Sequence, residues 1–226
     1  SVKIGGVGGV TVFDPALAEL AYSWWTRPGS KVFDPFAGGI CRGLVASALG
    51  RSYLGVDIRP EQVDANESHG AKGARWVSAN AATFSPPPSD FVFSCPPYGS
   101  LEVYSDDPRD LSTMAWDEFG QSYSAAIGRS VDALRPDRFA AFLVGNYKER
   151  GVLRDLASLT VEAFGRAGAD LYADMVYVQP VGSAALRAAA SFPTNRRPMP
   201  RHQMLLVFVK GDRKCAAKYV TEQAAS

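Results

Sequence analysis

The sequence contains few cysteines and histidines. Its 226 residues include three cysteines and two histidines. The odd, widely spaced set of Cys41, Cys95 and Cys215 argues against a disulfide framework and against a zinc site. Such sparse cysteines fit the reducing conditions of the cytoplasm. We therefore expect a cytoplasmic protein without a bound metal.

Long apolar runs and an excess of basic residues are also missing. No run approaches the ~20 residues that a membrane-spanning helix needs, and no secretory signal opens the chain, so we expect no membrane partner. The 24 lysines and arginines are balanced by 23 acidic residues, which leaves a net charge of +1. A nucleic-acid partner would therefore have to be attracted by local clusters of basic side chains.

The sequence does contain enough apolar material for a folded domain. Hydrophobic residues make up 46% of the chain and charged residues 21%, as in globular proteins. Short apolar runs alternate with helix-like segments, which predicts a single three-layer α/β domain over residues 1–226, with a doubly wound, mostly parallel sheet of seven strands. The expected strands are residues 31–34, 52–57, 75–79, 90–95, 138–145, 171–179 and 202–210. The expected helices are residues 14–25, 40–49, 60–69, 116–134 and 152–167.

Some segments depart from this alternation. The last two expected strands have no obvious helix between them, which allows an antiparallel pair. Residues 98–115 and 181–201 form long irregular stretches, and loops of this length in a compact domain usually have a function. The polar tail, residues 212–226, is expected to be peripheral.

A turn rich in small residues follows the first expected strand. The strand ends at Asp34, and the sequence DPFAGG (residues 34–39) leads into the next helix. Open α/β sheets bind ligands at the carboxyl ends of their strands, and glycine lets a ligand approach the backbone closely. A tight turn without a ligand would account for the glycines equally well.

Polar side chains also follow the second and third strands. Asp57 comes about 20 residues after the glycine turn, a spacing typical of a carboxylate that accepts ribose hydroxyls. Asn80 follows the third strand, where a side-chain amide could meet the edge of an adenine ring. A helix-capping role would also explain Asp57.

The fourth strand leads into the sequence CPPY, residues 95–98. Two successive prolines cannot continue a strand ladder, so they predict a rigid, extended turn at the carboxyl edge of the sheet. Tyr98 then offers an aromatic ring that can stack on a planar substrate.

DPFAGG, Asp57 and CPPY together resemble S-adenosylmethionine-dependent DNA methyltransferases that modify amino groups of adenine or cytosine, in a form similar to phage and prophage enzymes. The resemblance implies a class I methyltransferase fold with S-adenosylmethionine as cofactor and DNA as partner. It also implies that the opening helix borders the cofactor. The implied cofactor-binding residues are Phe13, Asp14, Pro15, Asp34, Phe36, Ala37, Gly38, Gly39, Asp57, Ile58, Asn80 and Ala81. The implied base-binding residues are Cys95, Pro96, Pro97 and Tyr98.

Cys95 departs from the family pattern, which has Asp, Asn or Ser before the two prolines. In one interpretation the cysteine is a tolerated variant, and Ser94 or backbone carbonyls such as that of Pro96 hold the target amine. In another, Cys95 is the nucleophile of a cytosine carbon-5 methyltransferase, with Asn146 or Glu149 near the ring. A buried, inert cysteine is the third possibility.

Residues 181–201 carry basic side chains without an intervening acid. Such a strip favours contact with DNA phosphates, and residues 98–115 and 181–201 are the candidate base-recognition loops. Little of the chain is left for target recognition, so the sequence predicts a short recognition sequence, relaxed specificity, or help from an additional recognition domain or subunit. An RNA or protein methyltransferase and a non-catalytic cofactor-binding subunit remain alternatives. The candidate DNA-contacting residues are Arg187, Arg196, Arg197 and Arg201.

Overall fold

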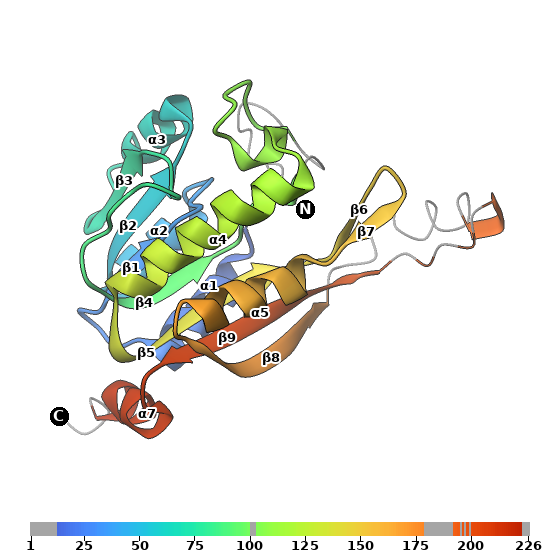
Figure 1. The fold of residues 1–226 in the computed structure, drawn as a ribbon. Helices are drawn as coiled ribbons and strands as arrows, with labels where there is room; N and C mark the ends of the chain where they lie inside the picture. The colour runs from blue at the N-terminus through green and yellow to red at the C-terminus, as the bar shows by residue number, and fades with distance from the viewer. Residues whose placement is uncertain are drawn as a thin grey trace.

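The structure, a computed structural model, describes residues 13–99, 103–178, 192–194, 196, 198 and 200–222. Strands and helices alternate along most of this part of the chain (Figure 1). In order, the elements are α1 (Pro15–Trp25), β1 (Lys31–Asp34), α2 (Cys41–Ala48), β2 (Ser52–Asp57), α3 (Pro60–Glu67), β3 (Ala74–Ser78), β4 (Ser89–Ser94), the short 3-10 helix η2 (Leu111–Thr113), α4 (Trp116–Ala133), β5 (Leu134–Val144), β6 (Tyr147–Glu149), β7 (Val152–Arg154), α5 (Leu156–Arg166), β8 (Asp170–Val178), β9 (His202–Lys210) and α7 (Arg213–Thr221).

In the described part of the chain, seven strands form one sheet in the order β3-β2-β1-β4-β5-β9-β8. The first five strands of this order are parallel, whereas β9 runs antiparallel to both β5 and β8. The expected doubly wound, mostly parallel sheet is therefore confirmed, as is the antiparallel pairing of the last two strands. The chain winds outward from β1 to β3 and then returns to β4 on the other side of β1. The carboxyl ends of β1 and β4 thus mark the switch point where such sheets bind ligands.

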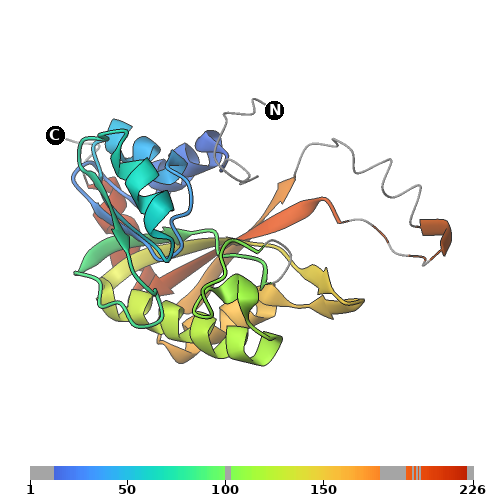
Figure 2. The ribbon, with the colours of Figure 1, turned by 90° about the horizontal axis from the view of Figure 1, so that it is seen from above.

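Helices cover both faces of the sheet. Side chains of α1, α2, α3 and α7 pack on one face, and those of α4 and α5 pack on the other, so that the sheet lies between two helical layers (Figure 2). The central strand β4 is buried along its whole length, with Phe91 and Phe93 on the first face and Val92 on the second. This two-sided burial explains why its three middle residues, 91–93, are all apolar and do not alternate with polar ones.

Two elements begin four residues away from their expected starts. β5 begins at Leu134 rather than at residue 138, because Leu134 pairs with Ser89 of β4. A register shift follows that includes Pro136 and Asp137, which has a φ of +56°. The expected helix 152–167 begins only at Leu156, because Asp155 caps it by accepting a hydrogen bond from the amide of Ser158 at 3.1 Å. The preceding residues form β7.

The polar tail is not peripheral along its whole length. Residues 213–221 form α7, which begins where the Asp212 carboxylate accepts hydrogen bonds from two backbone amides. The Tyr219 hydroxyl lies 3.1 Å from the Ser30 hydroxyl, and the Arg27 and Arg138 guanidinium groups lie over its ring at 4.1 and 3.3 Å. The helix therefore packs against the body of the domain. Among the described residues, no helix has the length and apolar character required of a membrane span.

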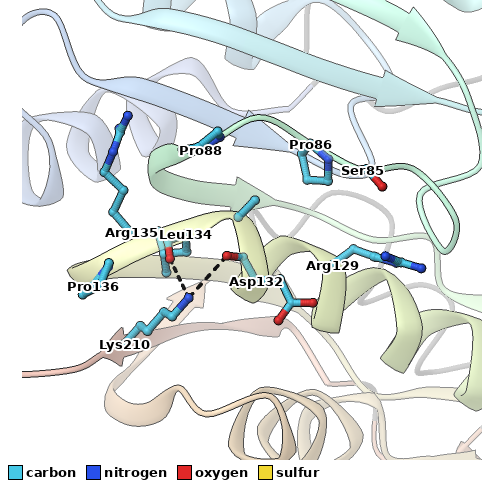
Figure 3. A pocket seen from close by; sticks show the side chains of 10 residues that line it. Ser85, Pro86, Pro88, Arg129, Asp132, Leu134, Arg135, Pro136 and Lys210 are labelled. Atoms are coloured by element: carbon cyan, nitrogen blue, oxygen red, sulfur yellow. Dashed lines mark hydrogen bonds between the residues drawn. The ribbon is translucent and has the colours of Figure 1, made fainter.

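A cavity of about 460 Å³ lies at the amino end of β5, away from the switch point (Figure 3). Prolines, arginines and Lys210 line it. The Lys210 ammonium donates hydrogen bonds to the carbonyl oxygens of Val131 and Leu134 at 2.6 and 2.7 Å, at the end of α4. Lys210 therefore closes the carboxyl end of this helix, which is a structural role.

Candidate functional site

The carboxyl ends of β1 and β4 are joined by a buried hydrogen-bond network around Asp34. Its carboxylate accepts hydrogen bonds from the Ser94 hydroxyl at 2.6 Å, the Tyr53 hydroxyl at 2.7 Å and the Phe36 amide at 3.1 Å. The Ser94 hydroxyl also accepts a hydrogen bond from the Phe36 amide at 3.2 Å. DPFAGG and CPPY are therefore neighbours. The Ser94 hydroxyl is engaged here and is not directed at a target amine, contrary to one interpretation of the sequence.

Arg42 completes this network from α2. Its side chain is 5% exposed, and its Nε donates a hydrogen bond to Asp34 at 2.6 Å. Its Nη2 donates to the carbonyl oxygens of Phe36 and Ala37 at 2.8 and 3.0 Å. Burial disfavours the charged guanidinium, but the nearby Asp34 carboxylate outweighs burial and raises the pKa of Arg42 above its ordinary value. Arg42 thus holds the backbone of the glycine turn through a permanent charge.

Gly38 occupies the centre of the glycine turn. Its φ of +51° is a conformation that glycine adopts without steric cost. Its amide donates a hydrogen bond to Asp57 at 3.0 Å, and its carbonyl accepts one from the Asn66 side chain at 2.8 Å. A Cβ built on Gly38 or on Gly39 would meet no atom of the described residues within 4 Å, apart from its own chain neighbours. The turn is therefore fixed at its backbone and open on its outer side.

Gly55 of β2 lies behind the same turn. A Cβ at this position would lie 2.7 Å from the Cβ of Ala37 and 2.8 Å from the rings of Tyr53 and Trp76. The absence of a side chain therefore lets the turn approach β2, where the Ala37 amide donates to the Val56 carbonyl at 2.8 Å.

Sequence reasoning missed three residues that hold this site: Arg42, Asn66 and Gly55. Asn66 is 2% exposed and Arg42 is 4% exposed, although both are polar. Each lies on a helix that follows a motif strand, but a helical arginine or asparagine is by itself no signal of burial. Only the position of the helix over the turn reveals their roles.

Asp57 lies at the end of β2 with a side chain that is 10% exposed. Besides the Gly38 amide, its carboxylate accepts hydrogen bonds from the amide and Nε of Arg59 at 2.9 and 3.2 Å. The Arg59 guanidinium in turn lies 5.5 Å from the centre of the Tyr104 ring. Residues 103–115 thus contact the Asp57 end of the site through Arg59.

The other residues expected near the cofactor lie along the same edge. Ile58 follows Asp57 directly, and Ala81 follows Asn80 after β3; all are partly buried. The Asn80 side-chain oxygen accepts a hydrogen bond from the Ala82 amide at 2.9 Å and so shapes the turn after β3. Ser78 pairs with Asp57 in the β2–β3 register, which brings the two strand ends together.

The opening residues lie on the other side of the network. The Phe13 ring lies 4.7 Å from the Arg42 guanidinium and packs edge-on against Phe93. Asp14 caps α1 by accepting from the Ala16 amide, and it also accepts a hydrogen bond from the Tyr177 hydroxyl at 2.8 Å. Pro15 is exposed at the first position of the helix. Phe13 therefore contacts the group that holds the glycine turn, whereas Asp14 ties α1 to β8.

CPPY leaves β4 with Pro96 buried and with Cys95, Pro97 and Tyr98 partly buried. The Cys95 Sγ lies 3.8 Å from the Tyr98 hydroxyl, which also accepts a hydrogen bond from the Gln203 side chain. Burial raises the pKa of the Cys95 thiol, and the nearby Arg42 opposes this only in part. The thiol is therefore protonated near neutral pH, which does not favour a nucleophilic role.

Asn146 and Glu149, the residues considered beside Cys95, are engaged elsewhere. The Asn146 side-chain oxygen accepts a hydrogen bond from the Ala157 amide at 3.0 Å, at the start of α5. Glu149 pairs with Arg154 at 2.7 Å within the β6–β7 hairpin. In these contacts neither side chain is placed as a proton donor beside Cys95.

The basic residues proposed for DNA contact are only partly described. Arg187 and Arg197 lie outside the described residues. Arg196 is exposed, and its guanidinium lies 5.7 Å from the centre of the Phe192 ring. Arg201 is partly buried directly before β9.

Solved structures with a similar fold include methyltransferases. The TehB-like S-adenosylmethionine-dependent methyltransferase of Corynebacterium glutamicum ATCC 13032 aligns over 89% of this chain and 90% of its own, with a TM-score of 0.54 and 18% identity. Precorrin-6y C5,15-methyltransferase of Geobacter metallireducens GS-15 aligns over 91% and 94%, with a TM-score of 0.57 and 13% identity. The chain has the fold of class I methyltransferases. The [4+2]-cyclase SpnF shares it, with a TM-score of 0.61, 14% identity and coverage of 87% and 81%, so the fold alone does not specify the reaction.

Sequence similarity to a curated protein is confined to one segment. Over 53 residues the chain is 40% identical to the type II methyltransferase M.XycI of Xanthomonas campestris pv. cyanopsidis. This segment takes in 24% of this chain and 18% of that protein. No protein-family model matches the chain.

Proposed function

We propose that this protein is an S-adenosylmethionine-dependent DNA methyltransferase that modifies the exocyclic amino group of a flipped-out base. One observation carries the proposal. The Ser94 hydroxyl contacts both the Asp34 carboxylate and the Phe36 amide. The residue directly before CPPY is therefore in contact with the first residues of DPFAGG. A methyl donor and a planar acceptor held by these two turns would be adjacent. The partial similarity to a type II methyltransferase supports DNA as the substrate.

The residues at the edge of β1, β2 and β3 fit S-adenosylmethionine. The glycine turn has open space on its outer side, where the methionine part would lie against Phe36, Ala37, Gly38 and Gly39. The Asp57 carboxylate is a suitable acceptor for the ribose hydroxyls, and Ile58, Asn80 and Ala81 border the position of the adenine ring. Asp34 is fully buried and its oxygens are occupied, so we assign it a positioning role.

The chemistry then needs little more than positioning. When bound, S-adenosylmethionine supplies a methyl group on a positively charged sulfur, and this methyl is transferred in line to a nucleophilic nitrogen. A base within a duplex is out of reach, so it must be extruded and held by stacking and by hydrogen bonds. In our proposal the Tyr98 ring stacks on the base, and backbone carbonyls of the Cys95–Pro97 segment accept from its amino group.

An amino group is favoured over cytosine carbon 5 by the surroundings of Cys95. Attack on carbon 6 needs a thiolate and a proton donor near ring nitrogen 3. The Cys95 thiol has a raised pKa, the Asn146 side-chain oxygen accepts from an α5 amide, and Glu149 pairs with Arg154. For recognition of a specific sequence, we propose that a further domain or subunit assists this chain.

Removal of the Asp57 carboxylate tests the cofactor site. We expect Asp57→Ala to weaken S-adenosylmethionine binding roughly 10- to 150-fold, because hydrogen bonds to a charged group contribute about 1.5–3 kcal/mol. Isothermal titration calorimetry measures the Kd. Asp64→Ala removes an exposed carboxylate from α3 and is the matched control, for which no change is expected. An unchanged Kd in Asp57→Ala would exclude this carboxylate from the cofactor site.

Replacement of Cys95 by serine separates the two base chemistries. We expect Cys95→Ser to retain methyl transfer and to share the pH profile of the wild type between pH 7 and 9. A thiolate mechanism would instead abolish activity in the variant. Because the thiol pKa is raised, the thiolate fraction in the wild type would rise about tenfold per pH unit over this range. Initial rates of methyl transfer to DNA at several pH values measure both effects.

A further inference from the structure

The hairpin formed by β6 and β7 is a separate two-stranded sheet beyond the end of β5. Glu149 pairs with Val152, so the connecting loop has two residues, Arg150 and Gly151, with φ of +48° and +84°. Positive φ at both central positions is typical of the type I′ turn, which matches the twist of the flanking strands. The hairpin is therefore a well-defined ribbon, and it projects from the body of the domain in both views (Figures 1 and 2).

The hairpin exposes apolar side chains on both of its faces. Val152 is 55% exposed and Leu153 is 58% exposed. Consecutive strand residues point to opposite faces, so at these two positions neither face of the hairpin is covered by the described residues of the domain. Isolated two-stranded hairpins gain little stability from such residues, because these are left in water. The exposed pair is therefore better explained by contact with another molecule.

The charge of the hairpin indicates which kind of molecule. Arg154 pairs with Glu149, whereas Lys148 and Arg150 make no ion pair with any described residue. Arg150 is exposed at the tip, and Lys148 is partly buried along the strand. Two positive charges thus remain on a narrow ribbon of a chain whose net charge is only +1. A polyanion is the complementary partner.

The base of the hairpin contacts the CPPY loop. Tyr147 is 7% exposed, and its ring centre lies 6.3 Å from that of Tyr98 and 6.2 Å from that of Trp116. Gly99 approaches Tyr147 so closely that a Cβ there would overlap the Tyr147 hydroxyl. The Arg154 guanidinium lies 5.3 Å from the Trp116 ring centre. The hairpin is therefore anchored beside the residue that we propose to stack on the base.

We propose that the β6–β7 hairpin enters the major groove of duplex DNA next to the flipped base, with Lys148 and Arg150 on phosphates and with Val152 and Leu153 against the groove wall. This inference rests on the proposed function. A three-residue strand extends about 10 Å, which matches the ~8.5 Å depth of the groove. The groove is ~12 Å wide and admits a two-stranded ribbon.

The test compares two double variants that remove the same charge. K148A/R150A changes the hairpin, and K72A/R75A removes one exposed lysine and one exposed arginine near β3, at the far edge of the sheet. Fluorescence anisotropy measures the Kd for a labelled duplex between 50 and 300 mM salt. Each lost phosphate contact lowers the slope of log K against log salt by about 0.9. We expect K148A/R150A to lower this slope by about 2 and to weaken binding roughly 10- to 30-fold near 0.15 M salt.

The control variant is expected to bind DNA as the wild type does, and both variants to bind S-adenosylmethionine normally. Leu153→Ser should weaken DNA binding without changing the salt slope. If the wild type methylates DNA and K148A/R150A matches K72A/R75A, the hairpin proposal is overturned and the proposed function stands. If the wild type binds S-adenosylmethionine but neither binds nor methylates DNA, the hairpin proposal and the proposed function are both contradicted. Equal hairpin-dependent binding to duplex RNA, whose major groove is too narrow for a ribbon, would overturn the groove assignment.

Discussion

Replacement of Asp34 by asparagine is expected to lower the free energy of unfolding by about 3–5 kcal/mol, the usual cost of breaking a buried ion pair by removing one partner. The Arg42 guanidinium would remain buried without its counter-charge, because the side chain of Arg42 is 5% exposed and that of Asp34 is fully buried. An asparagine could accept hydrogen bonds through one oxygen only. Its NH₂ group would face the Arg42, Tyr53 or Ser94 donors where the carboxylate has an acceptor. Urea unfolding followed by circular dichroism measures the change.

An exposed ion pair provides the control for this prediction. Glu162 and Arg166 lie 3.4 Å apart on α5, with side chains that are 68% and 66% exposed. Glu162→Gln should change stability very little, because solvent screens such pairs. If Asp34→Asn shifted the unfolding midpoint no more than Glu162→Gln does, the network around Asp34 would not hold the two turns together.

Loss of the Tyr98 ring is expected to reduce methyl transfer to DNA roughly 10- to 100-fold, because stacking of a base on an aromatic ring contributes about 1–3 kcal/mol. Tyr98→Ala removes the ring, whereas Tyr98→Phe removes only the hydroxyl that contacts Gln203 and Cys95. We therefore expect Tyr98→Phe to remain within a few-fold of the wild type. Single-turnover rates with saturating S-adenosylmethionine measure the effect.

The affinity for S-adenosylmethionine separates a role in base binding from a general loss of structure. It should be unchanged in both Tyr98 variants, since Tyr98 lies on the CPPY side of the network. Equal activity of Tyr98→Ala and the wild type would remove the stacking role. A loss in Tyr98→Phe as large as that in Tyr98→Ala would assign the effect to the hydroxyl instead of the ring.

The sequence was sufficient to predict the sheet and the pairing of the motifs with strand ends. The expected strands 31–34, 52–57 and 202–210 have the bounds of β1, β2 and β9. The apolar runs of β1 and β2 end at aspartates, and parallel strands bring such ends to one edge of the sheet. The contact between DPFAGG and CPPY follows from this topology, because β1 and β4 are adjacent.

The parts that could not be predicted depend on contacts between distant segments. Arg42 and Asn66 donate hydrogen bonds to the backbone of the glycine turn from two different helices. Neither the spacing nor the type of these residues in the sequence predicts these contacts. The β6–β7 hairpin could not be predicted from the sequence, because the apolar residues of Val152–Arg154 continue the pattern of the following helix. The positive φ of Arg150, which closes the hairpin, is uncommon for a residue with a side chain. Ser94 was one of the candidates for holding the target amine, because its contact with Asp34 is visible only in three dimensions.

One measurement tests most directly whether the two turns act as a single site of methyl transfer. The protein is incubated with unmethylated duplex DNA and methyl-labelled S-adenosylmethionine, and the DNA is digested to nucleosides for mass spectrometry. The account predicts label in N6-methyladenine or N4-methylcytosine. Label in 5-methylcytosine, or label in RNA or protein substrates with none in DNA, would contradict it.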